Sequence, residues 1–253
     1  MQQYGRNIVW GTAGVGNILG GICENFRVNK QFDETDEPDE VGDHAAHILS
    51  NRRDELSWAS KLIGGGKIPI IGGDGGCRIT VSGFPNVLLS SVTESGGNNQ
   101  PRKLQLNATS YPDLLAPIGG ADAVLTNIVI PPSAGALIYP NATVYFGTPD
   151  LKVSWGLIQN FTNTQQVKHN PISEDGKYRV VIVNGWEILF TLEVAMFLDQ
   201  PAPEPGQVLT LDNPPSWFKT KNYIKEASLQ YTINDKAVYS VTSRWTPVME
   251  MAA

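Results

Sequence analysis

The chain has few of the residues from which catalytic and metal sites are most often built. Only two of its 253 residues are cysteines and three are histidines, and 17% are charged. Cys23 and Cys77 have no spacing typical of a metal site or a disulfide framework, so we expect both to be buried as small apolar side chains. Two cysteines in a chain of this length also indicate a protein that does not depend on an oxidising compartment.

Long apolar runs and basic clusters are also missing. No window reaches the roughly 18 apolar residues of a membrane span, and the first residues lack the charged and apolar regions of a signal peptide. We therefore expect a soluble protein made in a cytoplasm, in which the glycosylation motifs at Asn107, Asn141 and Asn160 are accidental. The net charge is −6 and the basic residues are scattered, which argues against a grip on nucleic acid through phosphate neutralisation. It still allows DNA to slide past.

Glycine and proline are abundant, with 25 and 17 copies. They divide the chain into many short segments bounded by turns, which predicts an all-β fold with little helix. The segment 51–62 also fits a helix capped by Asn51. Its counterpart in the repeat described next, 186–194, is rich in β-branched and aromatic residues and favours strands for both. We expect strands at residues 17–32, 51–62, 77–81, 87–93, 103–111, 124–130, 136–146, 186–194, 208–211, 224–232 and 237–245.

The most informative feature that is present is an internal repeat. Gly21–Phe26 recurs 135 residues later as Gly156–Phe161, and both copies follow the pattern Gly-aliphatic-x-x-Asn-Phe. The closing segments Lys103–Pro112 and Val238–Pro247 keep this spacing. A further match, Glu55–Trp58 with Glu187–Phe190, implies a local spacing of 132.

The repeat predicts two tandem β-sandwich or barrel-like domains of similar topology. We place the first at residues 1–115 and the second at 116–253, with the runs 124–130 and 136–146 as leading strands of the second. No serine, cysteine or aspartate stands in a recognisable nucleophile motif. A duplicated module without a duplicated catalytic residue indicates building or binding, so we expect neither enzymatic activity nor a cofactor.

The most acidic segment is 33–43, which also contains a proline and a glycine. Such a segment cannot be a core strand and is typical of an exposed hairpin tip. Calcium binding is an alternative, but the alternating ligand spacing of a calcium loop is missing. The seven carboxylates in these eleven residues are Asp33, Glu34, Asp36, Glu37, Asp39, Glu40 and Asp43.

A metal site at Asp43, His44 and His47 is a second alternative for this region. On a strand the two histidines would face opposite sides of the sheet, which favours polar surface residues over ligands. The third histidine, His169, is expected in the turn of the second copy. We therefore expect no bound metal.

The segment 11–20 is rich in glycine and resembles a dinucleotide-binding loop. That motif needs a strand before the glycines and a helix after them, whereas a β-like segment follows here. We expect a flexible arm instead, one that becomes ordered on contact with a partner. Its glycines are Gly11, Gly14, Gly16 and Gly20.

Three of the six tryptophans, Trp58, Trp186 and Trp245, lie in expected strands of the two copies. A row of tryptophans would suit a sugar-binding face. Their neighbours are apolar, however, which favours packing in a core or at a subunit interface.

Taken in order, these segments resemble the tail-tube-like domain of tailed bacteriophages and related injection machines. The resemblance lies in a strand with Asn-Phe, an acidic hairpin with glycine, a polar-to-aromatic strand after Asn51–Glu55, and a final strand ending at Asn107–Asp113. It covers most of residues 17–113 and, more weakly, 153–248. Members of this family usually carry a short helix beside the sheet, and none is evident in this sequence.

The resemblance implies a domain whose sheets join around a central channel, six domains to a ring, with rings stacked through loops. A tandem copy implies a homo-oligomer in which three chains form a pseudo-hexameric ring, with a hexamer of chains as the other possibility. It also implies a place in the tail of the virion, assembly in the host cytoplasm, contact with other tail proteins and passage of DNA without sequence-specific binding.

The sequence therefore predicts a structural protein of a phage tail tube, or of an adaptor or hub in the tail. Two alternatives are a capsid decoration protein and a two-domain β-sandwich that recognises carbohydrate or a cell surface. In the first interpretation the acidic hairpin lines the channel or reaches the next ring. The glycine-rich arm is an equally suitable contact between rings.

Overall fold

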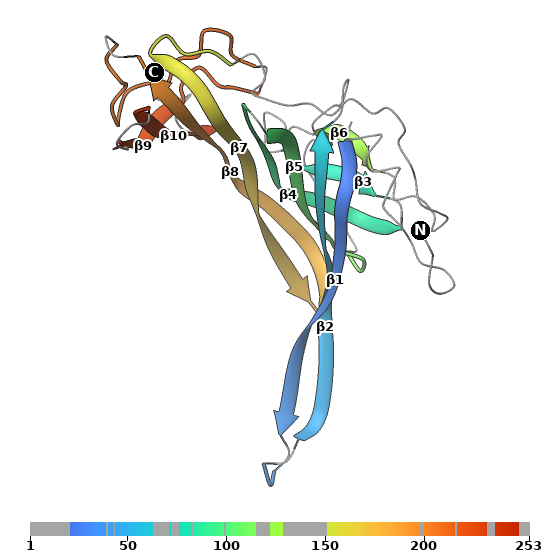
Figure 1. Cartoon of the computed structure of the whole chain (residues 1–253). Coiled ribbons are helices and arrows are strands. Elements are labelled where there is room, and N and C mark those ends of the chain that lie inside the picture. Colours follow the sequence, from blue (N-terminus) through green and yellow to red (C-terminus); the bar gives the residue numbers. More distant parts are fainter. Residues whose placement is uncertain are drawn as a thin grey trace.

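The computed structural model describes residues 21–38, 40–42, 44–62, 71, 76–81, 83–98, 100–114, 122–128, 151–197, 200–215, 217–231 and 236–247. Ten strands join into one sheet, shown in Figure 1. The described part contains no helical element, which confirms the all-β prediction. No membrane-spanning helix is therefore found among the described residues. The strands are β1 (Gly21–Pro38), β2 (His44–Leu62), β3 (Arg78–Val81), β4 (Phe84–Gly97), β5 (Gln100–Ser110), β6 (Asp122–Ile128), β7 (Gly156–Glu174), β8 (Lys177–Met196), β9 (Tyr223–Gln230) and β10 (Val238–Trp245).

The order of strands across the sheet repeats. It runs β1-β2-β5-β4-β7-β8-β10-β9, so a long hairpin followed by two shorter strands occurs twice. All neighbours along this path are antiparallel, and β4 pairs with β7 where the two halves meet. The short strand β3 pairs with β4 and, in parallel, with β6. The expectation that the run at 124–130 leads the second copy was wrong in its partner, because β6 pairs with β3 of the first half.

The irregularities of the two hairpins repeat as well. Each hairpin has three breaks in register, and those of β7 lie 135 residues after those of β1. Bulges of this kind bend a strand and increase its twist, so both hairpins are shaped alike. The breaks fall at Cys23/Asn25, Gln31/Asp33 and Glu37/Pro38 in β1 and at Ile158/Asn160, Gln166/Lys168 and Ile172/Ser173 in β7.

The same comparison corrects one match made from the sequence. Leu56 pairs with Ala108, and Phe190 pairs with Ser243 at the corresponding point of the second half. Leu56 therefore corresponds to Phe190, at a spacing of 134, and both side chains are buried. The match of Glu55 with Glu187 at a spacing of 132 was wrong, because the two copies correspond in their buried apolar residues and not in these charges.

One face of the sheet carries the core. Side chains alternate between buried and half-buried along β5, β7 and β8, as expected for strands with one solvated face. Trp58, Trp186 and Trp245 are all buried, as predicted, and the rings of Trp186 and Trp245 meet edge to face with centroids 4.7 Å apart. The larger of two apolar clusters combines residues from both halves of the chain, whereas the smaller one is built from residues 151–241.

Most of the expected strands in the described residues are confirmed, and two details differ. The segment 208–211 is not a strand and contributes only an isolated bridge from Val208 to Tyr223. Residues 95–97, expected in a turn, extend β4, because they pair with both neighbours. The expected strand at 136–146 lies outside the described residues.

The core predicts a clear contrast between two leucines. Leu106 is fully buried at the centre of β5, whereas Leu157 is 59% exposed. Replacing Leu106 by alanine leaves a cavity and should lower the free energy of unfolding by about 2–5 kcal/mol. The same change at Leu157 should alter it by less than about 0.5 kcal/mol. Denaturant titration of the two variants measures the difference, and equal values would contradict this account of the core.

Candidate assembly interface

The two halves meet along a single antiparallel pairing, which we call the inner seam: residues 91–97 of β4 with residues 160–166 of β7. Its seven pairs run from Ser91↔Gln166 to Gly97↔Asn160. On the solvent-facing side the hydroxyl oxygens of Thr93 and Thr164 lie 3.2 Å apart. In the inner seam, β4, the outermost strand of the first half, pairs with β7, the first strand of the second half.

The buried side of the inner seam is unusually polar. Glu94, Asn163 and Gln165 are at most 2% exposed. Burial raises the pKa of the Glu94 carboxyl, and the Arg102 guanidinium, whose Nε donates to it at 2.8 Å, opposes that shift. The side-chain oxygen of Gln165 accepts a hydrogen bond from the backbone N–H of Ile71 at 3.0 Å. The bond from Ile71 to Gln165 joins the two halves and would be lost in another register, whereas the bond of Glu94 to Arg102 lies within the first half. Each of the three residues also keeps one buried atom, Glu94 Oε2, Asn163 Oδ1 or Gln165 Nε2, without a hydrogen-bond partner among the described residues, which is costly.

The opposite side of the sheet is a continuous polar surface, which we call the polar face. It runs across both halves, and its hydroxyl and amide groups bond one another between strands. Its glutamates are held by neighbouring donors: Glu55 by Gln31, and Glu187 by Arg244, whose Nε donates at 2.7 Å. The polar face includes Arg27, Asn29, Ser57, Ser91, Thr93, Gln105, Asn107, Thr162, Thr164, Gln166, Thr191, Ser228, Gln230, Ser240 and Thr242.

The two long hairpins touch each other at one point. The β1–β2 hairpin extends well beyond the rest of the sheet, and the β7–β8 hairpin runs toward its middle (Figure 1). The turn of the second hairpin docks there: the backbone N–H of Asn51 donates to the carbonyl of Gly176 at 2.8 Å. Arg53 donates to the hydroxyl of Tyr178 at 3.0 Å and to Asp33 at 2.7 Å. The hydrogen bond from Arg53, followed by one from Asn51, holds the pKa of Asp33 below its ordinary value.

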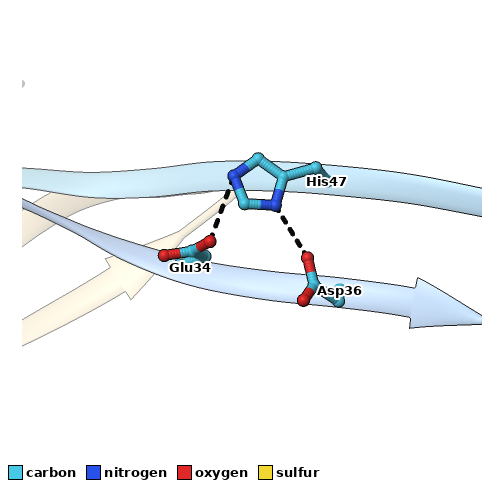
Figure 2. Close-up of side chains that lie close together, drawn as sticks. All are labelled: Glu34, Asp36 and His47. Atoms are coloured by element: carbon cyan, nitrogen blue, oxygen red, sulfur yellow. Dashed lines mark hydrogen bonds and ion pairs between the residues drawn. The ribbon is translucent and has the colours of Figure 1, made fainter. Parts of the chain in front are cut away.

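Farther along the first hairpin, one histidine lies between two carboxylates (Figure 2). His47 pairs directly with Asp36 across the hairpin, and its Nδ1 is 2.7 Å from Asp36 Oδ1. Its Nε2 is 3.2 Å from Glu34 Oε1. The hydrogen bond to Asp36, and then the charge of Glu34, raise the pKa of His47 above its ordinary value.

These three side chains are the described residues that could together offer ligand atoms to a cation, because those atoms lie within 4.8 Å of one another. All three are exposed, and they satisfy one another through the bonds to His47. The arrangement differs from the metal alternative drawn from the sequence, which had combined His47 with Asp43 and His44. The register of the hairpin, in which Asp36 faces His47, is the signal that brings them together.

The described acidic residues of the segment are exposed as predicted, except Asp33, which is half-buried, but most of them lie on a strand rather than in a turn. Asp33, Glu34, Asp36 and Glu37 lie on β1, and Glu40 lies in the turn that follows. Their separate contacts divide them, since Asp33 binds Arg53 whereas Glu34 and Asp36 bind His47. Asp39, Asp43 and the arm glycines Gly11, Gly14, Gly16 and Gly20 lie outside the described residues.

His169 was expected in a turn, and this was wrong: it lies on β7 and is half-buried. Its Nε2 is 3.0 Å from the carbonyl oxygen of Leu89 and 3.8 Å from the sulfur of Cys77. Burial lowers the pKa of His169 and raises that of the Cys77 thiol to about 12. A thiol that stays protonated is a poor nucleophile, so these residues form a packed link between the halves and confirm Cys77 as a buried side chain.

The cluster in Figure 2 predicts a titration. His47 should titrate above its ordinary value of 6.5, and the Asp36→Asn change should bring the value back toward 6.5. Because the folded pKa is raised, this contact stabilises the hairpin below pH 6.5 and is lost as the pH rises through the raised pKa. NMR titration of the ring protons measures it, with Glu40→Gln as a matched control that leaves the pKa unchanged. An unshifted His47 in the unmodified protein would contradict the geometry.

The inner seam, the polar face and the hairpins are therefore the features of this chain that bear on its function. No protein-family model matches this chain, and no curated protein is similar to it.

Proposed function

We propose that this chain is a non-enzymatic structural subunit of a bacteriophage tail or a related tube, assembling into rings through which DNA passes. The observation that carries the proposal is the repeated order and register of the sheet, in which one copy is added edge to edge to the next. Such a junction is head-to-tail, because different edges of the two copies meet. A head-to-tail junction that is repeated makes either a closed ring or an open filament.

The proposed ring contains three chains and six copies of the repeated sheet. Closure suits this sheet physically, because a sheet edge with unpaired N–H and C=O groups is a template for uncontrolled pairing. In a ring, each edge is paired with the next subunit. Repetition of the four-strand order around six copies produces one closed wall of strands.

The polar face is the surface that we assign to the channel. Its neutral hydroxyl and amide groups make a wall to which a phosphate backbone does not adhere, since tight binding of DNA needs unpaired cations. Some of the basic side chains on or near it have acidic partners, as in Arg53 with Asp33 and Arg244 with Glu187. The apolar face then packs against the outer parts of the ring.

The hairpins form one rim of the ring in this arrangement and are placed to meet the next ring. The first hairpin carries the five described acidic residues of the segment 33–43, whereas Lys168, Lys177 and Arg179 accompany Glu174 and Asp175 in the second. If the copies alternate, the rim has a three-fold pattern of charge over a nearly six-fold sheet. The tail of the virion, assembled in the host cytoplasm with other tail proteins, is where such a subunit would serve.

Recognition of sugars by the tryptophans receives no support from the fold. Trp58, Trp186 and Trp245 are buried in the core, so they offer no flat ring to a ligand. A carbohydrate site would have to be built from other residues.

The proposal is tested by the number of chains in the native assembly. Native mass spectrometry should give a multiple of three chains, and negative-stain images should show rings or tubes with a central hole. A protein that remains monomeric at all concentrations, and is retained on a glycan array, would replace this proposal by a binding module.

A further inference from the structure

Among the described residues, β1 and β9 are the two outermost strands along the main path of the sheet. In the repeat, β1 corresponds to β7 and β9 corresponds to β4, which are the two strands of the inner seam. We propose that β9 of one chain pairs with β1 of a second copy, in the register of the inner seam, to form an outer seam. This inference rests on the proposed ring and names the edges, the register and the partner.

The edges of β9 and β4 are each covered over their first part by a short segment of the same half. β3 covers β4 near Val87 and Leu88, which leaves residues 91–97 for β7. In the second half, segment 206–209 covers β9 at residues 222–224 through backbone hydrogen bonds. Thus Leu209 N–H donates to Asn222 and Ile224 N–H donates to Gln207, each at 2.8 Å. In both halves the covering segment stops before the residues that the seam uses.

The repeat fixes the register of the outer seam without adjustment. A bulge of β4 has its counterpart in β9. The first of the two breaks of β4 lies between Leu89 and Ser91, and β9 has the same break between Ile224 and Glu226. The pairs of the outer seam follow from those of the inner seam when 135 is added to each β4 residue number and subtracted from each β7 residue number. They are Glu226↔Gln31, Ala227↔Lys30, Ser228↔Asn29, Leu229↔Val28, Gln230↔Arg27 and Tyr231↔Phe26 of the second copy.

The apolar side chains of β9 and β1 are suited to pack against each other between two chains. Leu229 and Tyr231 are 41% and 76% exposed, an unusual state for large apolar side chains at a strand edge. Facing them in the outer seam are Val28 and Phe26, which are half-buried against the core of β1 and β2. Pairing with a second copy covers all four.

The inner seam buries polar side chains, whereas the outer seam would bury apolar ones. Where the inner seam buries Glu94 beside Asn163, the outer seam places Leu229 beside Val28. An apolar strand edge set against Asn163 and Gln165 would bury these polar groups beside Leu229 and Tyr231, whereas Val28 and Phe26 offer apolar contacts. The difference therefore directs β9 to β1 of another chain, and the two seams alternate around the ring.

A second contact comes with the outer seam. Asn51, which receives the turn of the second hairpin at Gly176, has a φ of 53°, and Gly185 stands at the same place in β8 with a φ of 64°. Gly42 of the first hairpin corresponds to Gly176, and both have positive φ. The turn at Gly42 of the second copy therefore docks at Gly185. The side chain of Lys168 lies beside Gly185, with its Cδ 3.4 Å from the point where a Cβ of Gly185 would stand. A basic residue therefore lies near the place that the acidic hairpin of the second copy would reach.

Paired cysteines test the register. Thr93 and Thr164 of the inner seam have hydroxyl groups 3.2 Å apart, so Thr93→Cys with Thr164→Cys should form a disulfide within one chain. Ser228→Cys with Asn29→Cys occupies the same place in the outer seam and should link chains into covalent trimers under mild oxidation. All variants carry Cys23→Ala, and Cys77 stays because it is buried. Ser228→Cys with Lys30→Cys is the matched control, because a shift of one residue points the second thiol to the other face.

The outcomes separate the seam from the ring. Covalent trimers from Ser228→Cys with Asn29→Cys, and their absence from the control, support the outer seam. Rings that form without this crosslink, while the inner pair does crosslink, would leave the tube standing and overturn the seam. A protein that is monomeric under all conditions would overturn the proposed function and the seam together.

A charge placed in the outer seam provides an independent test. Leu229→Lys should abolish rings and leave a folded monomer, because the lysine would be buried opposite Val28 of the second copy. Phe197→Lys is the matched control, since Phe197 is 43% exposed at the end of β8 and outside the seam. Size-exclusion chromatography and circular dichroism report assembly and folding, and intact rings with Leu229→Lys would overturn the seam.

Discussion

The pairing of β4 with β7 is the interaction on which the rest of the structure depends. It joins two arrays of strands with the same order, and it uses the open edge of one to satisfy the backbone groups of the other. Without it, a long row of N–H and C=O groups would remain unpaired on each half. The larger apolar cluster follows from this join, because it takes Leu106 from one half and Trp245 from the other.

A sheet that is apolar on one side and polar on the other is suited to form a wall. The apolar side needs a core, which the tryptophans and leucines supply. The polar side needs no cover, because its hydroxyl, amide and charged groups bond one another across strands, as Thr191 does with Thr242. This division of the faces supports the proposal that the polar face lines a channel, since most of its groups are neutral and Arg244 is paired with Glu187.

The polar residues at the inner seam give specificity at a cost in stability. Glu94 is held by Arg102 in a buried position, and Gln165 is held by the backbone of Ile71. The bond of Gln165 to Ile71 spans the two halves, so the inner junction cannot slip without losing it, whereas the bond of Glu94 to Arg102 lies within the first half. The hairpins extend the same logic outward, because the contact of Arg53 with Tyr178 fixes the second hairpin on the first.

Much of the fold was decided by local pattern, which the sequence carries by itself. Alternation of apolar and polar residues placed most strands, the recurrence of Gly-x-x-x-Asn-Phe revealed the two copies, and apolar neighbours predicted the burial of Trp58. Contacts between distant residues could not be found in this way. The partner of β6, the place of His169 beside Cys77, and the bond of His47 to Asp36 depend on register across strands, and register depends on bulges that leave no local mark. The sequence determined the strands and their repetition, whereas the tertiary structure alone decided which of the described strands pair along their edges, because edge pairing is a contact between segments far apart in the chain.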